Sequence, residues 1–92
     1  MAHLLHFYVS AKEGVSREQI ERKLNLGLDW YRYAPNLYVV HTSSSVDKWK
    51  ARLIDFIKPG GRLLILNFDA SQHQGWMNKD FWEWLREKSK AV

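Results

Sequence analysis

The chain has 92 residues, of which 46% are hydrophobic and 26% are charged, and none is cysteine. This length fits a single domain, residues 1–92, that buries only about 60 to 65% of its unfolded surface, and the lack of cysteine excludes disulfides, thiolate zinc sites and a cysteine nucleophile. Lys and Arg number 14 against 10 Asp and Glu, and the net charge of +4 favours anionic partners such as nucleic acid or nucleotides.

The first segment predicts a strand followed by a short helix. In residues 3–10, apolar and aromatic side chains occupy both odd-numbered and even-numbered positions. This pattern is typical of a central strand covered on both faces. Ser16 and Gln19 form a capping box, so we expect a helix that begins at Arg17 and ends near Asn25.

A hairpin and a second helix are expected next. Residues 28–33 and 37–42 are rich in aromatic and β-branched side chains and flank an Ala-Pro-Asn turn. The serine run 43–45 offers several N-caps for the helix that follows. We expect one apolar face on this helix, made of Val46, Trp49, Leu53, Phe56 and Ile57.

The segment after this helix predicts a buried strand. Residues 58–61, Lys-Pro-Gly-Gly, end the helix, and residues 62–68 are apolar at consecutive positions. Such a run is typical of a strand that is buried on both sides. The order strand, helix, strand, strand, helix, strand is the split βαβ arrangement, so we predict an α+β, ferredoxin-like fold with its core in residues 3–68.

An aromatic helix is expected at residues 76–88, after that core. Phe81, Trp84 and Leu85 form an apolar stripe, and Trp82 widens the apolar arc to roughly 160°. One core does not easily cover so broad an arc, and the sheet also has a second apolar face to bury, so we predict a sheet-mediated homodimer. The side chains expected at the dimer or partner contact are Trp76, Trp82 and Trp84.

Four segments carry a resemblance to a known family. They are the aromatic strand 29–33, the strand-to-helix passage 38–45, the apolar strand 63–68, and the run 75–85, Gly-Trp-Met-Asn-Lys-Asp-Phe-Trp-Glu-Trp-Leu. Together they resemble the short bacterial and phage proteins labelled SinR-family, which are similar to the smaller CRISPR adaptation protein. The resemblance implies a ferredoxin-like homodimer whose relatives bind nucleic acid, and some of those relatives cleave it with a metal held by an aspartate at the end of the first strand.

The chain departs from that family at the metal-binding position. Counted back from Gly14, the position falls on Val9 or Ser10, and neither side chain binds a hard cation as a carboxylate does. We therefore expect no nuclease activity and no cofactor. The alternative is a metal-dependent nuclease of the CRISPR adaptation type, in which Asp29 or Asp69 holds magnesium or manganese, although both residues also suit turns.

Candidate ligand-binding residues lie mainly on the second strand. This strand offers an aromatic ring for stacking, a guanidinium group and a phenol close together, from Trp30, Arg32 and Tyr33. Such groups bind nucleic-acid bases with little sequence specificity. An alternative is that Trp30 and one tyrosine fill the dimer face and that Arg32 is a charge at its rim. His6 and His41 lie on strands expected to be neighbours, where they share a metal or a phosphate or simply pack at the dimer interface. The full candidate set is Trp30, Arg32, Tyr33, His6, His41 and Arg62.

These observations lead to one main hypothesis and two alternatives. The main hypothesis is a non-enzymatic homodimer that binds nucleic acid or a nucleotide near the dimer groove. The alternatives are the metal-dependent nuclease and a protein-interaction or inhibitory module that docks through the Trp-rich C-terminal helix. No window approaches the roughly 18 apolar residues of a membrane-spanning helix, and the first residues do not form a secretion signal, so we expect a cytoplasmic protein without a membrane partner.

Overall fold

The computed structural model describes residues 1–71 and 73–90. Within these residues the chain forms one antiparallel sheet of four strands with three α-helices, so the fold class is α+β as predicted. The strands are β1 (His3–Ser10), β2 (Asp29–Ala34), β3 (Leu37–Thr42) and β4 (Arg62–Asn67). The helices are α1 (Arg17–Leu24), α2 (Val46–Leu53), the short 3-10 helix η1 (Ile54–Phe56) and α3 (Lys79–Lys90).

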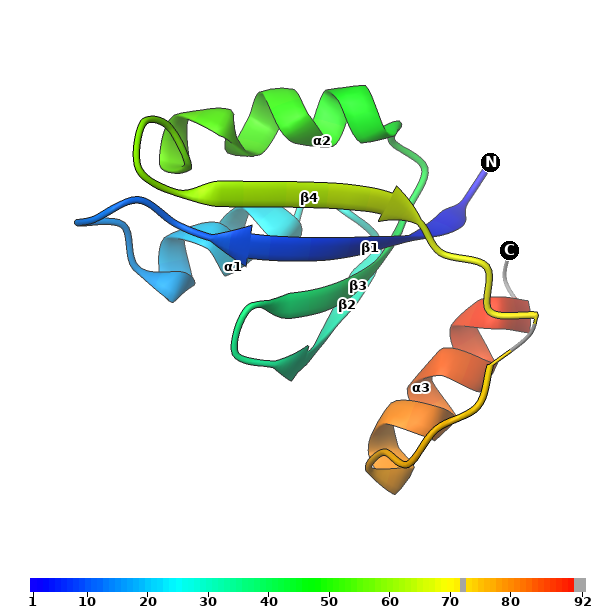
Figure 1. Cartoon of the computed structure of the whole chain (residues 1–92). Coiled ribbons are helices and arrows are strands. Elements are labelled where there is room, and N and C mark those ends of the chain that lie inside the picture. The colour runs from blue at the N-terminus through cyan, green and yellow to red at the C-terminus, as the bar shows by residue number, and fades with distance from the viewer. Residues whose placement is uncertain (72, 91–92) are drawn as a thin grey trace.

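The strands lie in the order β2-β3-β1-β4, so β1 is central as predicted. Every pairing is antiparallel. Helices α1 and α2 pack on one face of the sheet and α3 packs on the other (Figure 1). Because side chains alternate between faces along a strand, β1 contributes to both layers. Leu5 and Phe7 join the core under α1 and α2, and Leu4 joins the core under α3.

The larger core lies between the sheet and the helices α1 and α2. Trp49 of α2 is fully buried at its centre, and its ring meets the ring of Phe7 edge to face, with centroids 5.5 Å apart. Trp49 Nε1 donates to Thr42 Oγ1 at 3.1 Å, which satisfies the indole inside the core. Ser16 and Gln19 form the predicted capping box of α1, which fixes where that helix begins.

The second helix is shorter than the apolar stripe predicts. It ends at Leu53, and the chain tightens into η1 before the turn at residues 57–61. A Cβ atom on Gly61 would lie 2.3 Å from the Ser10 carbonyl oxygen, so only glycine allows this turn to approach the end of β1. Ile57 is still buried in the larger core, although it lies outside the helix.

The C-terminal helix covers part of the second face of its own sheet. Phe81 and Leu85 are buried against Leu4 and Val39, and the half-buried Trp82 and Trp84 flank this small core. The broad aromatic arc is therefore covered within one chain and needs no second protomer. The helix also begins at Lys79, three residues later than the expected position 76.

The prediction that β4 is buried on both sides is wrong. Among the described residues β4 pairs only with β1, which makes it an edge strand, and Leu64 and Leu66 are 51% and 48% exposed. A run of consecutive apolar residues indicates that a strand tends to be covered, but it does not say whether its own chain covers it. Among the described residues, each helix is too short or too polar to cross a membrane.

Candidate functional site

The pleat of β2 separates the predicted binding cluster. Trp30 packs against the larger core under α1 and α2, whereas Tyr33 packs against the small core under α3. Arg32 lies on the same side as Trp30, because residues two apart on a strand share a face. The strand therefore does not present its ring, guanidinium group and phenol to one ligand.

The partners of Trp30 and Arg32 hold the sheet to α1. Trp30 Nε1 donates to Asn25 Oδ1 at 2.8 Å, and Arg32 Nε lies 3.3 Å from Glu21 Oε2. The Tyr38 hydroxyl donates to the same carboxylate at 3.1 Å, and burial together with that bond raises the pKa of Tyr38. These contacts fasten α1 to β2 and β3, so both predicted ligand-binding residues have structural partners.

The structure brings His6 and Tyr33 together on the second face. The Tyr33 hydroxyl is hydrogen bonded to His6 Nε2, and the His6 ring stacks on Phe68 with centroids 6.2 Å apart. Burial lowers the pKa of His6 and raises that of Tyr33, so both groups are neutral near pH 7. The Tyr33 O–H is then the donor and the imidazole nitrogen the acceptor.

His41 shares that face with His6 but has different neighbours. The β1–β3 register pairs His41 with Leu4 and His6 with Val39, so the two histidines are diagonal neighbours. Burial, followed by the positive charge of Lys88, lowers the pKa of His41. His41 Nε2 is buried and has no hydrogen-bond partner among the described residues.

The two candidate acids serve local structure. Asp29 Oδ2 accepts from Trp84 Nε1 at 3.1 Å and lies 3.1 Å from Lys88 Nζ, so this carboxylate ties α3 to β2. Burial opposes the ionisation of Asp29, but the bonds from Lys88, the Trp30 amide and Trp84 outweigh it and hold its pKa below the ordinary value. Asp69 Oδ1 accepts from the Ser71 amide at 2.9 Å, as in a turn. Within residues 1–71 and 73–90, no three His, Asp or Glu side chains come together as a metal site requires.

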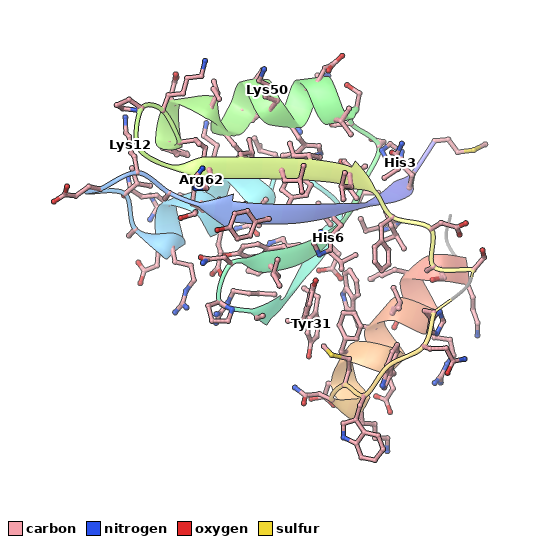
Figure 2. The ribbon with its side chains drawn as sticks, in the orientation of Figure 1. His3, His6, Lys12, Tyr31, Lys50 and Arg62 are labelled. Atoms are coloured by element: carbon pink, nitrogen blue, oxygen red, sulfur yellow. The ribbon has the colours of Figure 1, made fainter. Side chains whose placement is uncertain are left out.

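The remaining predicted residues lie at the surface. Arg62 is exposed at the start of β4 (Figure 2). The β1–β4 register pairs it with Ser10. Trp76 is 98% exposed in the loop before α3. Trp84 is engaged with Asp29, and Trp82 lines a surface pocket.

That pocket lies between α3 and the loop that precedes it, and sequence reasoning identified only one of its side chains. Its volume is about 440 Å³. The His73 and Trp82 rings stack on its wall, with centroids 5.3 Å apart and planes 24° from parallel. His73 Nδ1 donates to the Ala70 carbonyl oxygen at 2.8 Å, and among the described residues Nε2 has no hydrogen-bond partner. The lining residues are Ala70, His73, Gln74, Gly75, Trp82, Arg86, Ser89 and Lys90.

Two cations stand beside the stacked rings in this pocket. Arg86 and Lys90 are exposed, and neither forms an ion pair with a carboxylate of the described residues. A flat aromatic wall next to these two cations suits a ligand with a planar ring and a negative group. The sequence contains one indication of this pocket, because the spacing of four residues places Trp82, Arg86 and Lys90 on one face of the helix. The sequence does not indicate that His73 belongs to the pocket, since only the conformation of the loop brings this residue to the helix.

Comparison with known proteins identifies no relative of this chain. The chain matches no protein-family model, no curated protein and no solved structure. The candidate site therefore depends on its own geometry.

Proposed function

We propose that this protein binds single-stranded nucleic acid or a nucleotide in the pocket that α3 forms with Ala70 and residues 73–75. The observation that carries the proposal is the meeting of the stacked His73 and Trp82 rings with two cations, Arg86 and Lys90, that form no ion pair within residues 1–71 and 73–90. A base stacks on the exposed part of the aromatic wall, and a phosphate lies against the guanidinium and ammonium groups.

The two cations have a specific electrostatic task at this end of α3. The last turn of a helix carries the negative end of its dipole, which repels phosphate. Lys90 lies in that last turn and opposes the local field, and Arg86 adds a second positive charge one turn earlier on the same helix face, so removing both should cost more affinity than removing two cations that lie away from the pocket. The chain provides such a pair in Arg22 and Lys23, which are exposed on α1.

We also propose that the strands and the first two helices form a ferredoxin-like unit and that two copies associate. Antiparallel strands in the order β2-β3-β1-β4 with two intervening helices fit the split βαβ arrangement. Helix α3 leaves the β4 side of the second face open, where Leu64, Leu66 and the half-buried Tyr8 lie together. This apolar half of the sheet is the dimer surface in the proposal.

Fluorescence titration tests the binding proposal directly. Single-stranded DNA, single-stranded RNA, duplexes and cyclic nucleotides are added at low salt while tryptophan emission is followed. We expect Arg86→Gln with Lys90→Gln to weaken binding about tenfold or more, and the matched pair Arg22→Gln with Lys23→Gln to leave it nearly unchanged. Flat titrations with every ligand, or equal losses in the two double variants, contradict the proposal.

A protein-docking role is the second candidate function, and the exposure of Trp76 favours it. An indole that is 98% exposed is available as an anchor for another protein, and large aromatic side chains dominate such contacts. In this case Trp76→Ala abolishes capture of a defined partner while nucleic-acid binding persists. Loss of nucleic-acid binding in Trp76→Ala instead assigns this residue to the nucleic-acid site.

A further inference from the structure

The most apolar strand of the sheet has an open edge. Among the described residues β4 pairs with β1 alone, and its central residues 63–66 are Leu-Leu-Ile-Leu. Proteins usually protect an edge strand with charged side chains, proline, a bulge or a covering element, because unpaired backbone groups there accept a further strand. Residues 63–66 contain neither a charged residue nor proline, and the β1–β4 register runs without a bulge.

The ladder identifies which backbone groups face outward. The Phe68 amide donates to the Leu4 carbonyl oxygen at 3.0 Å, so the backbone of Phe68 faces β1. Leu66 lies two residues before Phe68 in the chain and pairs with His6 of β1. In an antiparallel ladder the backbone groups of alternate residues point to alternate sides. Those of Leu64 and Leu66 therefore bond to β1, whereas those of Leu63 and Ile65 face the open edge.

A groove runs beside this edge, between β4 and α2. Its volume is about 480 Å³. Leu63 and Ile65, whose backbone groups face the open edge, also supply side chains to the groove. The apolar lining residues are Val46, Ile54, Ile57, Leu63 and Ile65. An edge strand next to a helix is the geometry of strand addition, in which main-chain hydrogen bonds give affinity and alternate side chains fill an adjoining groove.

The charge of the groove selects among possible occupants. Lys50, Lys58 and Arg62 line it against the single carboxylate of Asp47. None of these three cations forms an ion pair within the described part of the chain. A second copy that added its own β4 would bring the same cations to the same edge, so charge repulsion disfavours it. An acidic segment has the opposite effect.

We propose that β4 and the groove beside α2 bind an extended, acidic segment of a partner protein as a fifth strand of the sheet. Apolar side chains at alternate positions of that segment enter the groove above Leu63 and Ile65. Its acidic residues meet Lys50 and Lys58, of which Lys50 points outward from α2 (Figure 2). This site is separate from the pocket at Trp82, so either one stands if the other fails.

Binding of a designed peptide panel tests the proposal. Peptides of about eight residues carry apolar side chains at alternate positions, and the other positions hold acidic, basic or neutral polar residues. Binding is followed by fluorescence anisotropy and by amide chemical shifts of the full chain. We expect the acidic peptides to bind at least about tenfold more tightly than the basic ones, and to shift amides of β4 and α2.

Two sets of variants separate strand addition from general charge attraction. Lys50→Glu should weaken acidic peptides about tenfold, whereas Lys48→Glu, with the same charge change on a part of α2 that does not line the groove, should not. Methylating alternate backbone nitrogens of the best peptide should abolish binding in one register and spare it in the other.

Several results overturn the proposal. They are no binding by any acidic peptide, equal binding of the acidic and basic panels, equal effects of Lys50→Glu and Lys48→Glu, and equal effects of methylation in both registers. A homodimer that Ile65→Pro dissociates, with the β1 ladder intact, assigns the edge to a second copy instead. Protection of the groove by an oligonucleotide assigns it to nucleic acid.

Discussion

Helix α3 should open separately from the rest of the domain, and a pair of substitutions tests this. Leu85 is 1% exposed in the small core under α3, and Leu53 is fully buried in the core under α1 and α2. Truncating a buried leucine to alanine costs about 2 to 5 kcal/mol. We expect the lower end, about 2 kcal/mol, for Leu85→Ala, because its core has only four buried members and is able to collapse.

The two variants differ in which amides they affect. A chain-terminal helix is able to leave the sheet without breaking any strand pairing, so the α3 amides exchange through that local opening. Leu85→Ala destabilises the docked state, and 2 kcal/mol corresponds to roughly thirtyfold faster exchange of the α3 amides. Leu53→Ala should accelerate the amides of β1 and leave those of α3 unchanged, since it weakens the core under α1 and α2 equally whether α3 is docked or undocked.

Hydrogen exchange followed by nuclear magnetic resonance measures both effects residue by residue. The central strand β1 reports complete unfolding, and α3 reports undocking. If Leu53→Ala accelerates the α3 amides as much as those of β1, the helix opens only with the whole domain and the reasoning fails. If Leu85→Ala changes no α3 amide, the helix is not held by the small core.

Three further predictions concern stability, pH and association. Asp29→Ala should lower the free energy of unfolding in urea by about 1 kcal/mol, since a half-exposed carboxylate loses its bonds to Trp84 and its neighbours; an unchanged midpoint contradicts this. Burial keeps the pKa of His6 below its ordinary value of 6.5, so the unfolded state binds the proton first and stability falls as the pH drops below that value. Melting temperatures should therefore fall less on acidification in His6→Gln than in the wild type, and equal falls contradict the assignment. Leu64→Glu should convert the proposed dimer into a single-copy species in sedimentation, and a wild-type chain that is already single-copy at high micromolar concentration removes the dimer proposal.

Local signals in the sequence predicted the elements well. The capping box of Ser16 and Gln19 and the two-sided apolar pattern of β1 depend on near neighbours, and both are present as expected. The pattern of β4 did not reveal an edge strand, because a run of apolar residues is the same whether its own chain or another molecule covers it. The width of the aromatic face of α3 predicted a partner molecule. The sequence pattern did not predict that the loop before the helix covers part of Trp82 through His73.

The candidate site was predicted less well than the fold. Strand alternation alone separates Trp30 from Tyr33, so the sequence already held the reason why that cluster divides. The unexpected partners were Asn25 and Glu21, which approach only when α1 packs on the sheet. His73 reaches Trp82 only through the loop conformation, and no spacing rule anticipates it.

The salt dependence of single-stranded DNA binding tests the proposed nucleic-acid site most directly. Each phosphate contact on a single strand contributes a slope of about 0.7 to the fall of log affinity with log salt. If Arg86 and Lys90 each contact a phosphate, replacing both with glutamine should lower the magnitude of that slope by about 1.4. A slope equal to that of the wild-type protein would contradict phosphate binding at this pocket.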